Sequence, residues 1–139
     1  MIDSFPRQRP LVMVADDDTE IAILVEILLQ REGYDVVTAM NGGEALELIE
    51  RKRPDVVVLD IMMPNLNGYE VVQRLRENKD TRFLPVILLS ARAGALDRKY
   101  GIRMGADDYI LKPFKAEDLL ARIASVLPAS VDEPAPARV

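Results

Sequence analysis

The chain has 139 residues, of which 49% are hydrophobic and 29% are charged, and its formal net charge is −5. These values fit one compact soluble domain, and they exclude a large multidomain enzyme, a disordered chain and a broad basic surface for nucleic acid. The chain has no histidine and no cysteine, which excludes imidazole and thiolate chemistry and leaves carboxylates, hydroxyls, lysine and the backbone.

The first half of the chain predicts two strands, each followed by a helix. The run Leu11–Ala15 is short and apolar, as a buried strand is. After it, apolar residues recur at the helical spacing i, i+3, i+4 and i+7, at Ile21, Leu24, Val25 and Leu28. Gly33 stands where a left-handed C-cap is expected. Asp35–Ala39 predicts the second strand, and the second helix is marked by Ala45, Leu46 and Ile49.

The second half of the chain predicts three more such units. The runs Val56–Leu59 and Val86–Leu89 are apolar on both faces, which is typical of central strands covered by helices on both sides. Asp108–Leu111 predicts the fifth strand. The helices are marked by Val71, Val72 and Leu75 after an Asn65 or Asn67 cap, by Leu96, Tyr100 and Met104, and by Leu119, Leu120, Ile123 and Leu127. Gly101 lies inside the fourth helix, where glycine costs about 1 kcal/mol relative to alanine.

Five alternating strands and helices predict an α/β fold with a doubly wound, five-stranded parallel sheet over residues 11–127. In this division, residues 1–10 are an N-terminal extension. Residues 128–139 are rich in proline and alanine, and we expect a linker or tail there. The chain is then either a single-domain protein or the first domain of a longer one.

Polar residues follow the predicted strands at their carboxyl ends, where doubly wound folds bind ligands. They are Asp16, Asp17 and Asp18 after the first strand, Asp60 after the third, Ser90 after the fourth and Lys112 after the fifth. The four carboxylates and the lysine have a formal charge of −3 together, so this cluster requires a cation. Oxygen ligands without histidine or cysteine favour Mg²⁺.

Each of these residues also has an ordinary structural interpretation. An acidic triplet before a helix is often an N-cap with acids in the first turn, and Asp18 or Thr19 fits the cap position. Lys112 before a proline predicts a turn, and Ser90 alone is an exposed hydroxyl. Their joint placement at the ends of four strands favours a functional site.

The segments VADDDTEI, VVLDIMMPNLNG, VILLSAR and ADDYILKPF resemble, in this order and at these intervals, the receiver domains of two-component response regulators. The resemblance covers residues 11–127 and implies a flavodoxin-like (β/α)5 fold, like that of chemotaxis regulators, with strand order 2-1-3-4-5. It implies that Asp60 is the phosphoacceptor. A sensor histidine kinase, a phosphotransfer protein or a small phosphodonor supplies the phosphoryl group, because the chain has no histidine of its own.

The resemblance also assigns roles around Asp60. Asp17 is a direct Mg²⁺ ligand, Asp16 acts on the ion through water, and the backbone carbonyl of Met62 is a third protein ligand, with Mn²⁺ able to replace Mg²⁺. Ser90 and Lys112 contact the phosphoryl oxygens, and the bond from Lys112 to the following proline is cis. The domain is then a signalling switch that catalyses only its own phosphorylation and dephosphorylation.

A switch and an output face follow from the same resemblance. Tyr109 turns inward as Ser90 moves towards the phosphoryl group, and the face of the fourth helix, fifth strand and fifth helix repacks. Arg98, Asp108, Asp118 and Arg122 resemble residues that join receivers of winged-helix transcription factors in a symmetric dimer, Arg98 with Asp118 and Asp108 with Arg122. Met104 and Ser125 replace a further pair. The structural alternative is a solvated charged face.

Two other functions remain as alternatives. A doubly wound phosphatase or nucleotide-binding enzyme would share the acidic strand end, but Glu20 stands where dehalogenase-type phosphatases have Thr or Val, and Gly42–Gly43 fits no phosphate-binding loop. A receiver that is never phosphorylated and acts as a scaffold has less support, because all five pocket residues are present. With no membrane-spanning run and no signal peptide, we expect a cytoplasmic protein whose receiver domain binds neither membrane nor nucleic acid.

Overall fold

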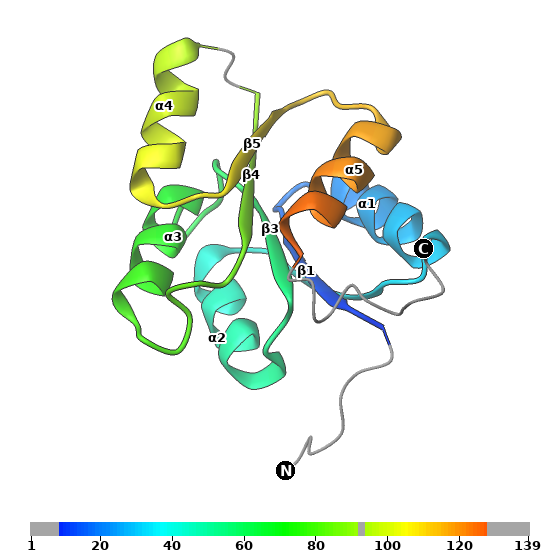
Figure 1. The fold of residues 1–139 in the computed structure, drawn as a ribbon, viewed down its shortest axis with the longest axis horizontal. Coiled ribbons are helices and arrows are strands. Elements are labelled where there is room, and N and C mark those ends of the chain that lie inside the picture. The colour runs from blue at the N-terminus through cyan, green and yellow to red at the C-terminus, as the bar shows by residue number, and fades with distance from the viewer. Residues whose placement is uncertain (1–8, 92–93, 128–139) are drawn as a thin grey trace.

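The computed structural model describes residues 9–91 and 94–127, so most of the predicted N-terminal extension and the whole predicted tail lie outside the described residues. Five strands and five helices alternate along the chain (Figure 1). They are β1 (Leu11–Ala15), α1 (Thr19–Arg31), β2 (Asp35–Ala39), α2 (Gly42–Lys52), β3 (Val56–Asp60), α3 (Gly68–Glu77), β4 (Val86–Ser90), α4 (Ala95–Met104), β5 (Asp108–Leu111) and α5 (Ala116–Val126). All strand pairs are parallel, in the order β2-β1-β3-β4-β5. The predicted fold and strand order are confirmed.

Helices cover both faces of this sheet, with α1 and α5 on one face and α2, α3 and α4 on the other (Figure 1). Each face has its own apolar core. Val25 and Leu29 of α1 join Leu119 of α5 in one, and Ile49 of α2 joins Leu75 of α3 in the other. Strands β1, β3 and β4 are buried along their whole length, as the apolar runs of β3 and β4 predicted.

The ends of the helices follow from local sequence. The Asp18 carboxylate accepts hydrogen bonds from two backbone N–H groups in the first turn of α1, which confirms it as the N-cap. Gly33, just after α1, has a φ of +96°, as its predicted role at the helix end requires. Asn67 caps α3 and forms a capping box with Glu70, so Asn67 rather than Asn65 has that role.

The predicted apolar faces of α1 and α4 are partly wrong. Leu24 of α1 is 51% exposed, and Ala22, Val25 and Leu29 are the buried residues of that helix. In α4, Leu96 is 79% and Tyr100 51% exposed. Among the α4 residues whose burial is described, Gly101 alone is buried. The apolar spacing of α4 therefore does not mark its inner face, because the helix contacts the sheet through a glycine.

Arg76, near the end of α3, joins the α3–β4 and α4–β5 connections. Its guanidinium donates hydrogen bonds to the backbone carbonyls of Leu84 (2.7 Å), Gly105 (2.9 Å), Arg82 (3.1 Å) and Thr81 (3.3 Å). It also forms an ion pair of 3.1 Å with Asp107, whose carboxylate accepts the N–H of Val86. We call these residues the Arg76 cluster.

No helix in the described ranges is long and apolar enough to cross a membrane.

Candidate functional site

The carboxyl ends of β1 and β3 bring three acidic residues together. Asp60 is the last residue of β3, and Asp16 follows β1, the strand beside it. One carboxylate oxygen from each of Asp16, Asp17 and Asp60 lies within 4.8 Å of the other two. Asp16 and Asp60 are buried, whereas Asp17 is exposed. These sequence-predicted residues thus form one cluster that opens to solvent through Asp17.

Lys112 provides the positive charge of the cluster. It follows β5, and its Nζ lies 2.9 Å from Asp16 Oδ2 and 3.0 Å from Asp60 Oδ1. The Lys112–Pro113 peptide bond is cis, as expected. The backbone N–H of Lys112 donates to the carbonyl of Ser90 at the end of the neighbouring strand β4. Residues from β1, β3, β4 and β5 therefore meet at one edge of the sheet.

Backbone groups lie against two of the acidic residues. The Asp18 N–H donates to Asp16 Oδ1 at 2.9 Å, so the start of α1 orients the buried Asp16 side chain. Gly68, the first residue of α3, lies against the backbone after Asp60. A Cβ atom at Gly68 would lie 2.8 Å from the Asp60 carbonyl oxygen and 2.9 Å from Ile61 Cα. The helix can approach Asp60 this closely only because residue 68 has no side chain.

The electrostatics of the cluster favour a bound cation. Burial raises the pKa of Asp60, the hydrogen bond from Lys112 opposes that rise, and the negative charges of Asp16 and Asp17 add to it. Burial lowers the pKa of Lys112, but its hydrogen bonds to Asp16 and Asp60 and their charges outweigh burial, so the pKa is raised. One ammonium group thus faces three carboxylates. This all-oxygen donor set with excess negative charge fits Mg²⁺.

The remaining predicted pocket residues differ in exposure. Ser90, the last residue of β4, is fully buried, so the interpretation as an exposed hydroxyl is wrong. Met62, two residues after Asp60, is 63% exposed. Tyr109 of β5 is only 2% exposed, so the structure already has this ring in the inward position that the resemblance associates with activation.

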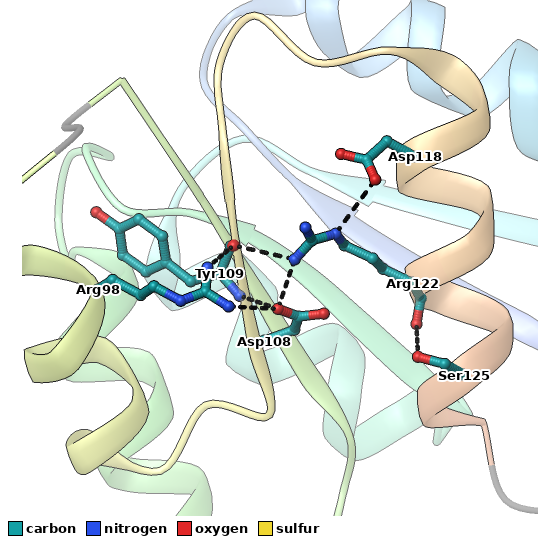
Figure 2. Close-up of polar contacts among 6 residues, drawn as sticks. All are labelled: Arg98, Asp108, Tyr109, Asp118, Arg122 and Ser125. Carbon is teal, nitrogen blue, oxygen red and sulfur yellow. Dashed lines mark hydrogen bonds and ion pairs between the residues drawn. The ribbon is translucent and has the colours of Figure 1, made fainter. Parts of the chain in front are cut away.

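On the predicted output face, charged residues pair within one chain (Figure 2). Arg122 Nη1 lies 2.8 Å from Asp108 Oδ1, and Arg98 Nη2 lies 3.5 Å from the same oxygen. Arg98 also donates to the carbonyl of Tyr109 at 2.8 Å. Asp118 lies 3.5 Å from Arg122, four residues along α5. Of the two pairs expected between chains, Asp108–Arg122 is therefore made within the chain. The contact of Arg98 with Asp108 was not predicted.

A family model described as response regulator receiver domain matches residues 12–124. The chain is 47% identical over 120 residues to "Probable transcriptional regulator ycf27" of Porphyridium aerugineum, a match that covers 86% of this chain and 49% of that protein. It is 41% identical over 116 residues to the alkaline phosphatase synthesis transcriptional regulatory protein PhoP of Bacillus subtilis, covering 84% and 48%. The chain spans about half the length of the curated relatives it matches.

Solved structures show the same likeness. The receiver domain of Francisella response regulator 1452 is 39% identical, with a TM-score of 0.80 over 85% of this chain and 96% of that one. The chemotaxis response regulator CheY4 of Vibrio cholerae is 34% identical, with a TM-score of 0.81 over 86% of this chain and 99% of that one.

Proposed function

Because the chain belongs to the response regulator receiver domain family, a signalling module rather than a classical enzyme, we propose that Asp60 accepts a phosphoryl group and thereby switches the face of α4, β5 and α5. The observation that supports this most is the contact of Lys112 Nζ with both Asp60 and Asp16, beside the third carboxylate of Asp17. Receiver domains are phosphorylated by histidine kinases, and a sensor kinase, a phosphotransfer protein or a small phosphodonor is the source here. This family membership argues against the alternative function, a doubly wound phosphatase or nucleotide-binding enzyme.

The transfer begins with an ionised carboxylate oxygen of Asp60 that attacks the phosphorus of the donor in line. A new O–P bond forms, and the bond from phosphorus to the donor breaks, with its electron pair leaving on the donor. Lys112 already contacts Asp60 and stabilises the charge on the phosphoryl oxygens. Ser90, at the end of the adjacent strand β4, supplies a hydroxyl donor. In dephosphorylation, water takes the phosphoryl group and Asp60 is restored.

Asp16, Asp17, Asp60 and the backbone carbonyl of Met62 are the groups that would hold Mg²⁺, or Mn²⁺ in its place. When bound, the ion neutralises charge on the carboxylates and on the phosphoryl group. The exposure of Asp17 supports this assignment, because an ion that keeps several of its waters needs a ligand that faces solvent.

Incubation with acetyl phosphate and Mg²⁺, followed by intact mass measurement, tests the proposal. The native protein should gain the mass of one phosphoryl group, and Asp60→Asn should gain none. Asp18→Asn is a matched control, because Asn also caps helices and Asp18 lies outside the carboxylate cluster. This control should gain mass like the native protein. A retained gain in Asp60→Asn would place the acceptor elsewhere.

The raised pKa of Asp60 predicts a pH-dependent stability. The folded state holds the Asp60 proton more tightly than the unfolded chain, so this residue lowers folding stability as the pH rises from its ordinary pKa of 3.8 through its folded pKa. Without divalent cations, Asp60→Asn should therefore raise the Tm by a few degrees at pH 7, and this gain should vanish near pH 4. Thermal denaturation at both pH values measures the difference. An equal or lower Tm at pH 7 would contradict the prediction.

The charged residues of the output face support a symmetric dimer of the phosphorylated form. Arg98 and Asp118 have half-exposed side chains, at 52% and 51%. Within the described part of the chain they do not pair with each other, although Arg98 contacts Asp108 and Asp118 contacts Arg122, each at 3.5 Å. Asp108 and Arg122 already pair internally at 2.8 Å, and their ion pair would have to be exchanged between the chains. Arg98 with Asp118 is therefore the expected pair that is not already made within one chain.

Mixing two variants tests this dimer. Arg98→Glu and Asp118→Arg should each weaken association of the phosphorylated protein by about tenfold or more, since both symmetric pairs become like-charged. An equimolar mixture of the two should recover association, because each variant then meets an opposite charge at both sites. Analytical ultracentrifugation with and without acetyl phosphate measures this, and Lys99→Glu on the same helix controls for added negative charge. Failure of the mixture to recover association contradicts the assigned pair.

The matches cover only about half the length of the relatives named as transcriptional regulators. We infer that the output face acts on a separate effector part, which in a transcriptional regulator would be the part that binds DNA. The receiver itself has no role in base recognition in this proposal.

A further inference from the structure

Helix α4 meets the sheet at Gly101, in the middle of the helix. A Cβ atom at this position would lie 3.0 Å from Leu88 Cδ1 and 3.0 Å from Tyr109 Cδ2, with Tyr109 Cε2 at 3.4 Å. Contacts of 3.0 Å are closer than carbon atoms normally approach. Helix α4 therefore lies nearer to the Tyr109 ring than a residue with a side chain would allow without movement.

Space explains this glycine, and backbone conformation does not. Among the described residues, the glycines with positive φ are Gly33 and Gly105, so Gly101 has an ordinary helical backbone. Glycine lowers the stability of a helix interior. The close packing of α4 against Leu88 and Tyr109, which only glycine allows, compensates for this loss of helix stability.

Both neighbours are buried in the same apolar core, but they differ in their position in the sheet. Leu88 lies in β4 between β3 and β5 and is fully buried in the core. Tyr109 lies in the edge strand β5, and its carbonyl accepts a hydrogen bond from Arg98 of α4. This bond ties the Tyr109 backbone to the helix, so an added atom at residue 101 would turn the ring rather than separate α4 from β5.

We propose that Gly101 is a positioning residue for the switch. Because residue 101 has no side chain, the Tyr109 ring has room in the inward position. Gly101 thereby sets the equilibrium between the two states of the output face. The inference rests on the proposed role of Tyr109 in that switch. It differs from the pocket chemistry, because Gly101 touches none of the carboxylates and affects only how the modification is read out.

Gly101→Ala tests the proposal through the ring itself. In protein labelled with 3-fluorotyrosine, the ¹⁹F resonance of Tyr109, assigned with Tyr109→Phe, should move towards the shift of an exposed tyrosine in Gly101→Ala. Lys99→Ala, which adds no atom near the ring, should leave it unchanged. Phosphoryl uptake from acetyl phosphate should stay within about twofold of the native rate, whereas the gain in association on binding beryllofluoride with Mg²⁺ should fall at least about fivefold.

Two results would overturn the inference. One is an unmoved Tyr109 resonance together with a raised Tm, because helix propensity alone predicts that alanine stabilises α4. The other result applies when the Gly101→Ala protein does not fold. If the double variant Gly101→Ala/Tyr109→Ala is then also unfolded, the added methyl group does not clash with the Tyr109 ring. A folded double variant supports the proposal.

The proposed function can fail independently of this inference. A native protein that gains no mass from acetyl phosphate would refute phosphorylation at Asp60. The ¹⁹F shift of unphosphorylated Gly101→Ala would still show whether residue 101 positions the ring.

Discussion

Lys112→Met slows phosphoryl uptake at Asp60 by about 10²- to 10³-fold, if the lysine stabilises the transferring group as proposed. Methionine keeps a long unbranched side chain but removes the ammonium that lies 2.9 Å from Asp16 and 3.0 Å from Asp60. Asp16 has no exposed surface, so it loses a charged partner that water cannot fully replace. We therefore also expect the free energy of unfolding to fall by about 1–3 kcal/mol.

The rate is measured by intact mass over time, at a temperature where circular dichroism shows that the variant is folded. Lys115→Met is the matched control, because Lys115 is exposed just before α5 and has no recorded contact with the acidic cluster. It should react at the native rate. An uptake rate for Lys112→Met within tenfold of the native rate would remove the lysine from the mechanism.

Arg76→Ala should lower the free energy of unfolding by about 2–4 kcal/mol. The side chain of Arg76 is 20% exposed and binds four backbone carbonyls besides Asp107. Its loss removes a hydrogen-bond donor from each of those carbonyls and the ion-pair partner of the Asp107 carboxylate. Arg76→Lys should recover only part of the loss, since one ammonium group cannot reproduce the fixed arrangement of guanidinium donors.

Urea denaturation measures this effect, with Arg74→Ala as control. Arg74 lies two residues earlier in the same helix and is exposed, so its removal should change stability by less than about 0.5 kcal/mol. Similar losses for the two alanine variants would show that the Arg76 cluster does not stabilise the domain.

The fold and the acidic cluster were predictable because they depend on local patterns and on one topological rule. The runs of β3 and β4 are apolar on both faces, which is required of strands covered on both sides. Parallel strands also end at one edge, so Asp16, Asp60 and Lys112 could be expected to meet without knowledge of side-chain geometry. Lys112 lies within 3.0 Å of both Asp16 and Asp60, which agrees with that expectation.

The faces of the helices and the contacts between distant polar residues were not predictable in this way. In α4, the apolar residues Leu96 and Tyr100 are exposed by half or more, because contact with the sheet is made by Gly101, which periodicity counts as neutral. The Arg76 cluster depends on backbone carbonyls from two connections, and no residue pattern encodes their direction. The contact of Arg98 with Asp108 likewise depends on the placement of α4 against β5.

The two ends of α4 differ in how they are held. At its C-terminal end, Gly105 adopts a left-handed conformation and its carbonyl accepts the Arg76 hydrogen bond, whereas Gly94 at the other end provides no side-chain cap. Arg98, three residues after the start of α4, also bonds the Tyr109 carbonyl, so the helix is held at both ends of its contact with β5. With a rise of about 1.5 Å per residue, Gly101 lies about 6 Å and Ala95 about 15 Å from Gly105. A rotation of α4 about Gly105 would therefore move the start of the helix about two to three times as far as Gly101, and it would have to break the Arg98–Tyr109 hydrogen bond or carry β5 with it.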